Sequence, residues 1–182
     1  ISTKIKYLTL YAFSTENWKR PKDEIKFLFN LLENFLTKKV KNLVKNKIKI
    51  KFIGDKKKLP IDLKKLLKET ESKTNFLDKL QVNIALNYGS KNEILNAIKL
   101  TIKDKKRITE KNIEDNFYTK KIPNPDLLIR TGNTKRLSNF LLWQIAYTEI
   151  FFEKKLWPEF KKSDFSKILK SFKSLKRNFG SI

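Results

Sequence analysis

Apolar and polar positions follow two different periods along this chain. Stretches that alternate with a period of two, or that run apolar throughout, predict β-strands, whereas apolar positions recurring at steps of three and four predict helices. The predicted strands cover about 5–13, 48–53, 81–87, 126–131 and 149–152, and the predicted helices about 22–45, 61–71, 92–102, 109–117 and 163–177. Because strands and helices alternate, we expect an α/β fold with an open, mostly parallel sheet flanked by helices.

The clearest helical pattern covers about 22–45 and follows Pro21. Asp23 and Glu24 suit the first turn of a helix, where a carboxylate interacts favourably with the helix dipole. Two interpretations of its stripe of phenylalanine and leucine remain open. The stripe is a face of the hydrophobic core, or part of it lines an elongated apolar cavity for a hydrocarbon ligand.

A dense run of polar side chains separates the first predicted strand from this helix. We expect it at the carboxyl end of the strand, where open α/β sheets bind ligands. The alternative interpretation is a turn that caps the helix, but a cap does not require an amide, an indole and a guanidinium in one cluster. The candidate site residues here are Ser14, Thr15, Glu16, Asn17, Trp18 and Arg20.

Length and composition restrict the chemistry. The 182 residues fit one domain, which we expect to cover 1–182, and the sequence contains no apolar run long enough to span a membrane and no signal peptide. These features predict a cytoplasmic protein. The absence of cysteine and histidine excludes thiolate nucleophiles and the commonest zinc ligands. Carboxylates and hydroxyls remain, and these oxygen ligands favour Mg²⁺ as cofactor.

The formal net charge of +23 comes mostly from lysines spread along the whole chain. Such a charge attracts nucleic acid and anionic membrane alike. We expect no specific nucleic-acid partner, because the arginines do not form a stripe and no nucleic-acid-binding motif is present. Arg20, Arg130 and Arg136 are more informative than the lysines, because lysine cannot reproduce the bidentate fork that binds phosphate or carboxylate.

A second candidate cluster follows the predicted strand at 126–131. Arg130 ends the strand, and Arg136, Leu137 and Ser138 come shortly after, so two guanidinium groups and a hydroxyl form a candidate diphosphate clamp. Glu149 is the nearby candidate for holding Mg²⁺. The alternative interpretation is that Asp126 and Glu149 pair with the arginines in ordinary surface salt bridges.

Several long motifs, in order along the chain, resemble the cis-prenyltransferases, and most closely the bacterial undecaprenyl diphosphate synthases. The resemblance runs from the first residues to the last. The motifs are Tyr11-Ala-Phe-Ser-Thr-Glu-Asn-Trp-Lys-Arg-Pro21, Ile53-Gly-Asp55, Asn87-Tyr-Gly89 with Glu93, Pro125-Asp-Leu-Leu-Ile-Arg-Thr131, Arg136-Leu-Ser-Asn-Phe-Leu-Leu-Trp-Gln144, Trp157-Pro-Glu-Phe160 and Arg177-Asn-Phe-Gly180.

The resemblance implies a homodimeric enzyme, each subunit an open six-stranded sheet with an apolar tunnel, that adds isopentenyl diphosphate in cis to farnesyl diphosphate. The product would be undecaprenyl diphosphate, the precursor of the lipid carrier for cell-wall glycans. Ser14, Thr15, Glu16, Trp18 and Arg20 would contact the allylic substrate. By the same resemblance, Asn17 is the proposed proton acceptor, the residues Arg130, Arg136, Leu137 and Ser138 would bind isopentenyl diphosphate, and Glu149 would help to hold Mg²⁺.

The chain also departs from the family pattern. The family's first strand ends in an Asp-Gly-Asn-Gly-Arg segment, and this sequence starts downstream of it, with Ile1-Ser-Thr-Lys, so the domain is expected to be incomplete at its amino end and to lack its first strand. Smaller departures are Gly132-Asn-Thr-Lys135 and the pair Ser90 and Lys91. The alternative function is a degenerate, non-catalytic homologue that acts as a partner subunit or binds a membrane surface. Peripheral contact with an anionic inner membrane face is a further expectation.

Overall fold

The structure, a computed structural model, describes residues 5–177. The chain divides into two compact units, Ile1–Ile122 and Pro123–Ile182. The start of the sequence at Ile1-Ser-Thr-Lys and most of the motif that begins at Arg177 lie outside the described residues. The single domain that the sequence predicts over 1–182 stays a prediction.

The first unit contains a three-stranded parallel sheet in the order β1-β3-β2. Its strands are β1 (Tyr7–Ser14), β2 (Ile48–Ile53) and β3 (Leu80–Tyr88), close to the predicted ranges. The register pairs Ser14 with Tyr88 and Ile53 with Ala85, so all three carboxyl ends lie at one edge of the sheet. The α/β class with parallel strands is therefore confirmed.

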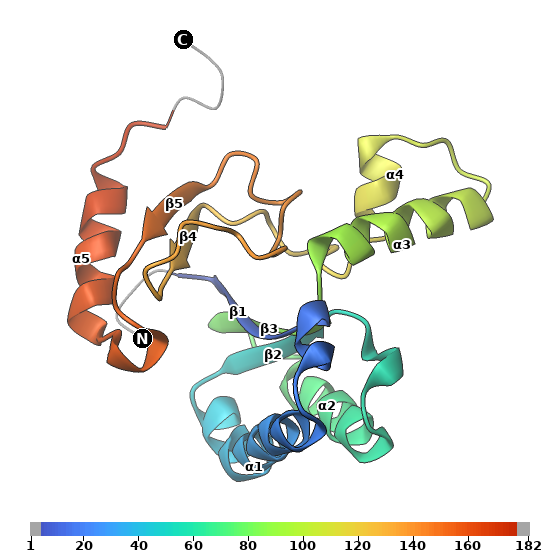
Figure 1. Cartoon of the computed structure of the whole chain (residues 1–182), viewed down its shortest axis with the longest axis horizontal. Coiled ribbons are helices and arrows are strands. Elements are labelled where there is room, and N and C mark those ends of the chain that lie inside the picture. Colours follow the sequence, from blue (N-terminus) through green and yellow to red (C-terminus); the bar gives the residue numbers. More distant parts are fainter. Residues whose placement is uncertain (1–4, 178–182) are drawn as a thin grey trace. The chain divides into compact units, whose positions relative to one another are not determined.

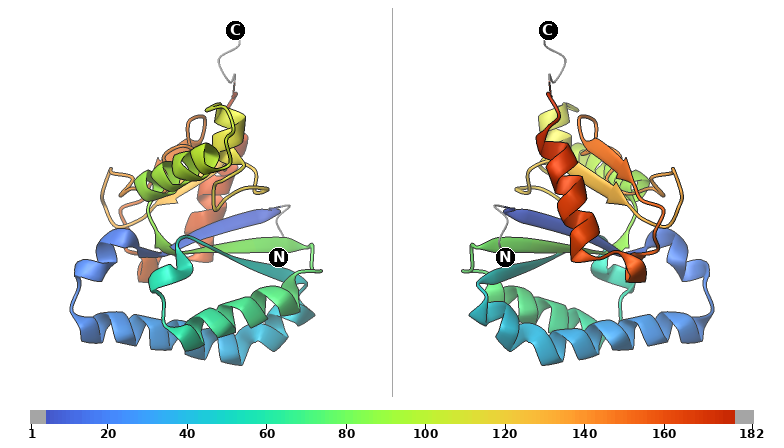
Figure 2. Two further views of the ribbon diagram at one scale, coloured as in Figure 1. Left: turned by 90° about the vertical axis from the view of Figure 1, so that its right-hand side faces the viewer. Right: turned by 90° about the vertical axis from the view of Figure 1, so that its left-hand side faces the viewer.

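Helices α1 (Lys22–Lys45) and α2 (Ile61–Thr74) cover one face of this sheet, as Figures 1 and 2 show. The helix predicted at 22–45 has the predicted bounds. After β3 the chain forms α3 (Ser90–Lys103) and the short α4 (Glu110–Glu114). The core between the sheet and the two covering helices consists of Phe13, Ile25, Phe29, Leu36, Ile50, Phe52, Leu59, Leu63, Leu67, Ile84 and Leu86.

The second unit contains a two-stranded parallel sheet made of β4 (Leu127–Arg130) and β5 (Glu149–Phe152). It also contains α5 (Lys162–Lys173), near the predicted range. Among residues 5–177 the strands thus form two separate sheets, and β1 is an edge strand of the first. The single six-stranded sheet implied by the resemblance stays a prediction.

Within the described part of the chain, no helix combines the length and the apolar character needed to cross a membrane.

Gly54, just after β2, allows an unusually close approach to β3. Its φ is +119°, and a Cβ built on it would lie 2.0 Å from the backbone oxygen of Leu86. Asp55 N also donates to Asn87 O at 3.2 Å. The end of β2 therefore lies directly against the backbone of β3, an arrangement that any larger residue would disrupt.

We predict that Gly54→Ala lowers the free energy of unfolding by roughly 2–4 kcal/mol, because it adds a backbone clash to the strain of a positive φ. The matched control is Gly132→Ala, since Gly132 also has a positive φ of +90° but only the side chain of Leu156 lies near its Cβ position, at 4.0 Å. Urea denaturation measures both variants. Equal losses in the two would show that the close approach at Gly54 contributes nothing.

Candidate active site

Polar side chains gather at the carboxyl ends of the strands in the first unit. They border a cavity of about 310 Å³ whose walls include Thr15, Trp18, Asp55, Asn87, Lys99 and Tyr118. These residues come from the segments that follow β1 and β2, from the end of β3, and from α3 and the chain beyond it. The sequence predicted a site at this edge of the sheet, and the structure places a cavity there.

Most of the predicted site segment forms one short 3₁₀ helix, η1 (Thr15–Lys19), while Ser14 ends β1 and Arg20 follows η1. The Asn17 side chain folds back on the strand end, because Ser14 N donates to Asn17 Oδ1 at 2.8 Å. The one acceptor atom of the Asn17 side chain is therefore engaged. Its Nδ2 has no partner among residues 5–177 and is available to donate to a ligand oxygen.

Trp18 is held on two sides. Its ring packs edge to face against Phe13 and Phe29, with centroids 5.3 and 5.8 Å away. Its indole Nε1 donates to Asn87 Oδ1 at 2.7 Å. The Trp18 ring thus joins the hydrophobic core to the polar edge of the sheet and fixes η1 between them.

The other polar residues of this segment make local contacts. Thr15 Oγ1 donates to Glu16 Oε2 at 3.1 Å, so these neighbours share one hydrogen bond. Arg20 pairs with Glu24 one turn later in the chain, and both side chains are about half exposed. The ion pair with Glu24, in the first turn of α1, uses part of the Arg20 guanidinium, which agrees with the helix-capping interpretation. The other N–H groups of this exposed side chain are open to water.

Glu93 belongs to the interior rather than to the exposed site. It is 1% exposed, and its carboxylate accepts from Tyr88 Oη at 2.5 Å and from Tyr118 N at 2.8 Å. Burial, reinforced by the Glu93 carboxylate, raises the pKa of Tyr88 well above its usual range. Burial, together with Asp55 and Glu93, raises the pKa of Tyr118 to about 12. Both phenols stay neutral at physiological pH.

In the second unit, Arg130 is the last residue of β4. Its Nε donates to Thr134 Oγ1 at 2.9 Å, which orients the guanidinium plane. No carboxylate pairs with Arg130 anywhere in residues 5–177, and its terminal amino groups have no partner there. The half-buried Arg130 is therefore a preoriented cation with free donors.

The segment after Arg130 has an unusual backbone. Ser138 and Leu141 have φ values of +48°, and Asn139 has +61°, all in the left-handed region. Such conformations cost energy in residues other than glycine and are often found at functional sites. Arg136 is exposed and, like Arg130, makes no ion pair with any described residue, while Leu137 is half-buried beside it.

The salt bridges that the alternative interpretation assigned to these arginines do not form. Asp126 pairs with Arg177 at 2.7 Å, and Arg177 also donates to the backbone oxygen of Tyr147 at 3.1 Å. Glu149 begins β5 opposite Leu127 and is half-buried. No ion pair of Glu149 is found within the described part of the chain.

Glu149 is the carboxylate that the sequence offers as a metal ligand. Residues 5–177 contain no group of three or more acidic side chains that could hold a metal by themselves. A single carboxylate still fits Mg²⁺ in sites where substrate phosphates and water complete the shell. The oxygen donors of this chain are therefore compatible with a metal that arrives with its substrate.

The hydrogen bonds that join distant segments of the chain were not predicted from the sequence. Nothing in the sequence pattern connects Trp18 to Asn87, or Tyr118 to Glu93. The position of Asn87 at the end of a buried strand and before Gly89 was the available signal, because an amide there has no apolar role.

The chain matches the model of a known protein family over residues 1–180, and the family is described as "Putative undecaprenyl diphosphate synthase". Two relatives named isoprenyl transferase are similar over most of their length. The protein from Thermotoga maritima is 43% identical over 98% of this chain and 78% of its own. The protein from Aquifex pyrophilus is 44% identical over 100% of this chain and 79% of its own.

Two solved structures are similar as well. A "probable undecaprenyl diphosphate synthase" from Campylobacter jejuni has a TM-score of 0.90 and 43% identity, over 97% of this chain and 84% of its own. Lavandulyl diphosphate synthase from Lavandula x intermedia was solved with dimethylallyl diphosphate. It has a TM-score of 0.91 and 36% identity, over 97% of this chain and 80% of its own. The chain therefore belongs to the cis-prenyltransferase family of undecaprenyl diphosphate synthases, as its motifs predicted, and this is a family of prenyltransferase enzymes.

Proposed function

We propose that this prenyltransferase condenses isopentenyl diphosphate with farnesyl diphosphate, in cis and repeatedly, to give undecaprenyl diphosphate. The observation that supports the proposal is that the guanidinium groups of Arg130 and Arg136 are not neutralised by any acidic side chain that the structure describes. Both lie in the second unit, and neither has a carboxylate partner among the described residues. Guanidinium groups without an internal partner are suited to bidentate contact with the oxygens of a diphosphate.

Arg130, Arg136 and Ser138 would bind the diphosphate of isopentenyl diphosphate, and Leu137 would contact its surroundings. Arg130 is preoriented by Thr134, so little side-chain freedom is lost when its remaining donors bind phosphate. Ser138 is exposed and has a left-handed backbone conformation.

Ser14, Thr15, Glu16, Trp18 and Arg20 would form the surroundings of the allylic substrate at the carboxyl edge of the first sheet. During the reaction the allylic carbon–oxygen bond breaks, diphosphate leaves, the alkene carbon of isopentenyl diphosphate bonds to the allylic carbon, and a proton is lost. Fixed donors that stabilise the charge on the leaving diphosphate lower this barrier.

Asn17 would position the path of the departing proton. An amide is a feeble base, and its Oδ1 already accepts from Ser14 N, so we infer that the proton ends on diphosphate or water rather than on Asn17. The free Nδ2 group of Asn17 would donate to the oxygen that receives the proton.

Glu149 would supply one protein oxygen to Mg²⁺, with the substrate diphosphate supplying others. When bound, the metal would neutralise part of the diphosphate charge.

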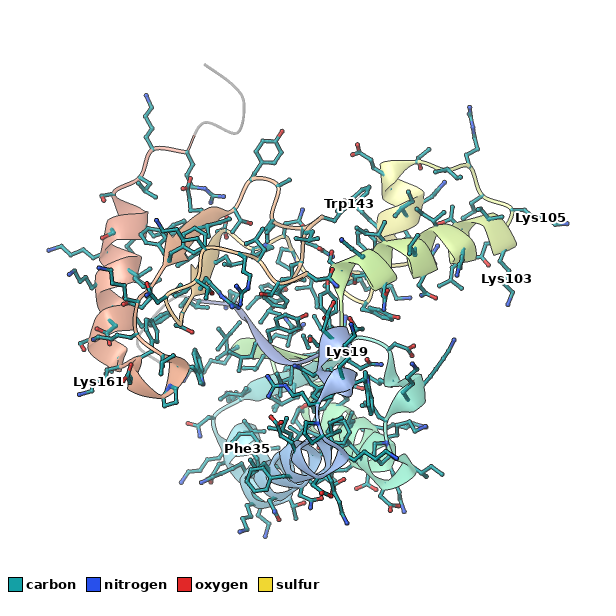
Figure 3. All side chains as sticks on the ribbon, viewed as in Figure 1. Lys19, Phe35, Lys103, Lys105, Trp143 and Lys161 are labelled. Atoms are coloured by element: carbon teal, nitrogen blue, oxygen red, sulfur yellow. The ribbon has the colours of Figure 1, made fainter. Side chains whose placement is uncertain are left out.

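The hydrocarbon chain would lie along α1. Three side chains spaced four residues apart on this helix are unusually exposed: Phe27 at 60%, Leu31 at 49% and Phe35 at 48%. Figure 3 labels Phe35 on α1. The opposite side of α1 packs in the core through Ile25 and Leu36. Both interpretations of the apolar pattern thus find support on different faces of one helix, and the exposed stripe would receive the prenyl chain.

We propose a homodimer in the cytoplasm, with peripheral contact to anionic lipid at the inner membrane face. The net charge of +23 supports attraction to such a surface, where a long hydrophobic product would be released. Lysine-rich charge alone gives no base-specific contacts, so no specific nucleic-acid partner is proposed.

We predict that Arg130→Lys and Arg136→Lys each raise the KM for isopentenyl diphosphate by about tenfold, because lysine keeps the charge but loses the fork. The measurement is steady-state incorporation of isopentenyl diphosphate into polyprenyl product with farnesyl diphosphate and Mg²⁺. Arg107→Lys is the matched control and should leave KM within about twofold, because Arg107 is exposed in a loop between α3 and α4. Equal effects at all three arginines would contradict the assignment, and so would an absence of incorporation above the protein-free rate.

We also predict that the double variant Leu31→Gln with Phe35→Gln binds allylic diphosphates more weakly than the parent chain. The loss of affinity should grow as the prenyl chain of the ligand lengthens, because each buried CH₂ contributes about 0.8 kcal/mol. Calorimetry should compare dimethylallyl, geranyl and farnesyl diphosphates. The matched control is Phe76→Gln, since Phe76 is exposed apolar surface outside α1. A loss of affinity that is the same for all three lengths would place the hydrocarbon elsewhere.

A further inference from the structure

Asn87, near the end of β3, joins three separate segments of the first unit. Its side chain accepts from Trp18 Nε1 at 2.7 Å and donates through Nδ2 to Asp55 O at 2.7 Å. Its backbone oxygen accepts from Asp55 N at 3.2 Å. The residue is 4% exposed, so these bonds are shielded from water and are costly to leave unmade.

An asparagine is required to make all of these contacts. The indole of Trp18 can only donate and the carbonyl of Asp55 can only accept, so the side chain between them must offer one acceptor and one donor. Aspartate would place a carboxylate oxygen against the Asp55 carbonyl, and glutamine would be one methylene too long. The φ of +48° at Asn87 also favours asparagine among residues with a side chain.

Close contacts surround this amide on two sides. The end of β2 is held against β3 by the close approach at Gly54, where an added Cβ would meet Leu86 O at 2.0 Å. On the other side, Phe13 and Phe29 pack against the Trp18 ring. Asn87 therefore links the end of β2 to Trp18, and through Trp18 to the segment 14–20.

We propose that Asn87 is a positioning residue for the allylic half of the site. It acts through Trp18, whose place in η1 sets the geometry of Ser14 and Asn17. This inference rests on the proposed function, because it assigns the segment 14–20 to the allylic substrate. Its consequence is selective: loss of the Asn87 amide impairs use of the allylic diphosphate and leaves binding of isopentenyl diphosphate, through Arg130 and Arg136, unchanged.

The test compares Asn87→Gly, Trp18→Phe and the double variant. Glycine tolerates the positive φ and removes both side-chain hydrogen bonds, while phenylalanine keeps an aromatic ring but removes the indole donor. We expect kcat/KM for farnesyl diphosphate to fall about tenfold in each single variant, because both variants lose the hydrogen bond between Trp18 and Asn87, while the KM for isopentenyl diphosphate stays within about twofold. The double variant should fall no further than the single ones.

A second measurement does not depend on activity. In the ¹⁵N–¹H spectrum of the full chain, the indole N–H resonance of Trp18 is identified by its absence in Trp18→Phe. In Asn87→Gly this resonance should shift and exchange faster with solvent, because its acceptor has gone.

Asn83→Gly is the matched control. Asn83 lies in the same strand, is fully buried and makes two side-chain hydrogen bonds, to Thr9 and from Gln81. Its loss should destabilise the fold as Asn87→Gly does, but should leave the Trp18 indole resonance and the kinetics for farnesyl diphosphate unchanged.

Two results would overturn the proposal: an unaltered indole resonance in Asn87→Gly, or multiplicative losses in the double variant. A parent chain without prenyl transfer would instead count against the proposed function, and the indole resonance would still decide whether Asn87 holds Trp18.

Discussion

The parallel pairing of β3 with both of its neighbours is the constraint on which the first unit depends. Because β1 and β2 run in the same direction as β3, the three carboxyl ends meet at one edge, and the polar residues that follow each strand are brought together there. Asn87, near the end of β3, forms side-chain hydrogen bonds to Asp55 and to Trp18. The strand register therefore determines which polar residues meet at this edge.

Charged groups in this chain divide by whether the fold already satisfies them. Glu93 is buried and fully engaged by Tyr88 and Tyr118, and Asp126 pairs with Arg177, so these groups serve structure. Arg130 and Arg136 have no acidic partner among residues 5–177. In a protein with 42 lysine and arginine residues against 19 acidic ones, most cations must lack partners, so charge alone assigns no function. The orientation of Arg130 by Thr134, and the strained backbone around Ser138, distinguish these arginines from the surface lysines.

The sequence predicted the local structure well, because periodicity reports local structure directly. The helix at Lys22–Lys45 and the strands at Ile48–Ile53 and Glu149–Phe152 have the predicted bounds. Contacts between distant segments were not predictable: Trp18 and Asn87 are 69 residues apart, and Asp126 and Arg177 are 51 apart. Their pairing follows from strand order and register, which a single sequence does not encode in any local pattern. The motif resemblance predicted the family correctly, whereas the roles of the site residues remain proposals.

The two proposed substrate sites are tested most directly by a titration followed by backbone amide chemical shifts. The ligands are an unreactive thio analogue of farnesyl diphosphate and, separately, isopentenyl diphosphate. We expect the farnesyl analogue to shift the amides of residues 14–20 and of α1, and isopentenyl diphosphate to shift those of residues 130–138. Both responses should persist at moderate salt, because the contacts are directional and partly buried. Shifts that spread over lysine-rich surfaces in both units and disappear as salt is added would show attraction by net charge alone. That result would contradict the two proposed sites.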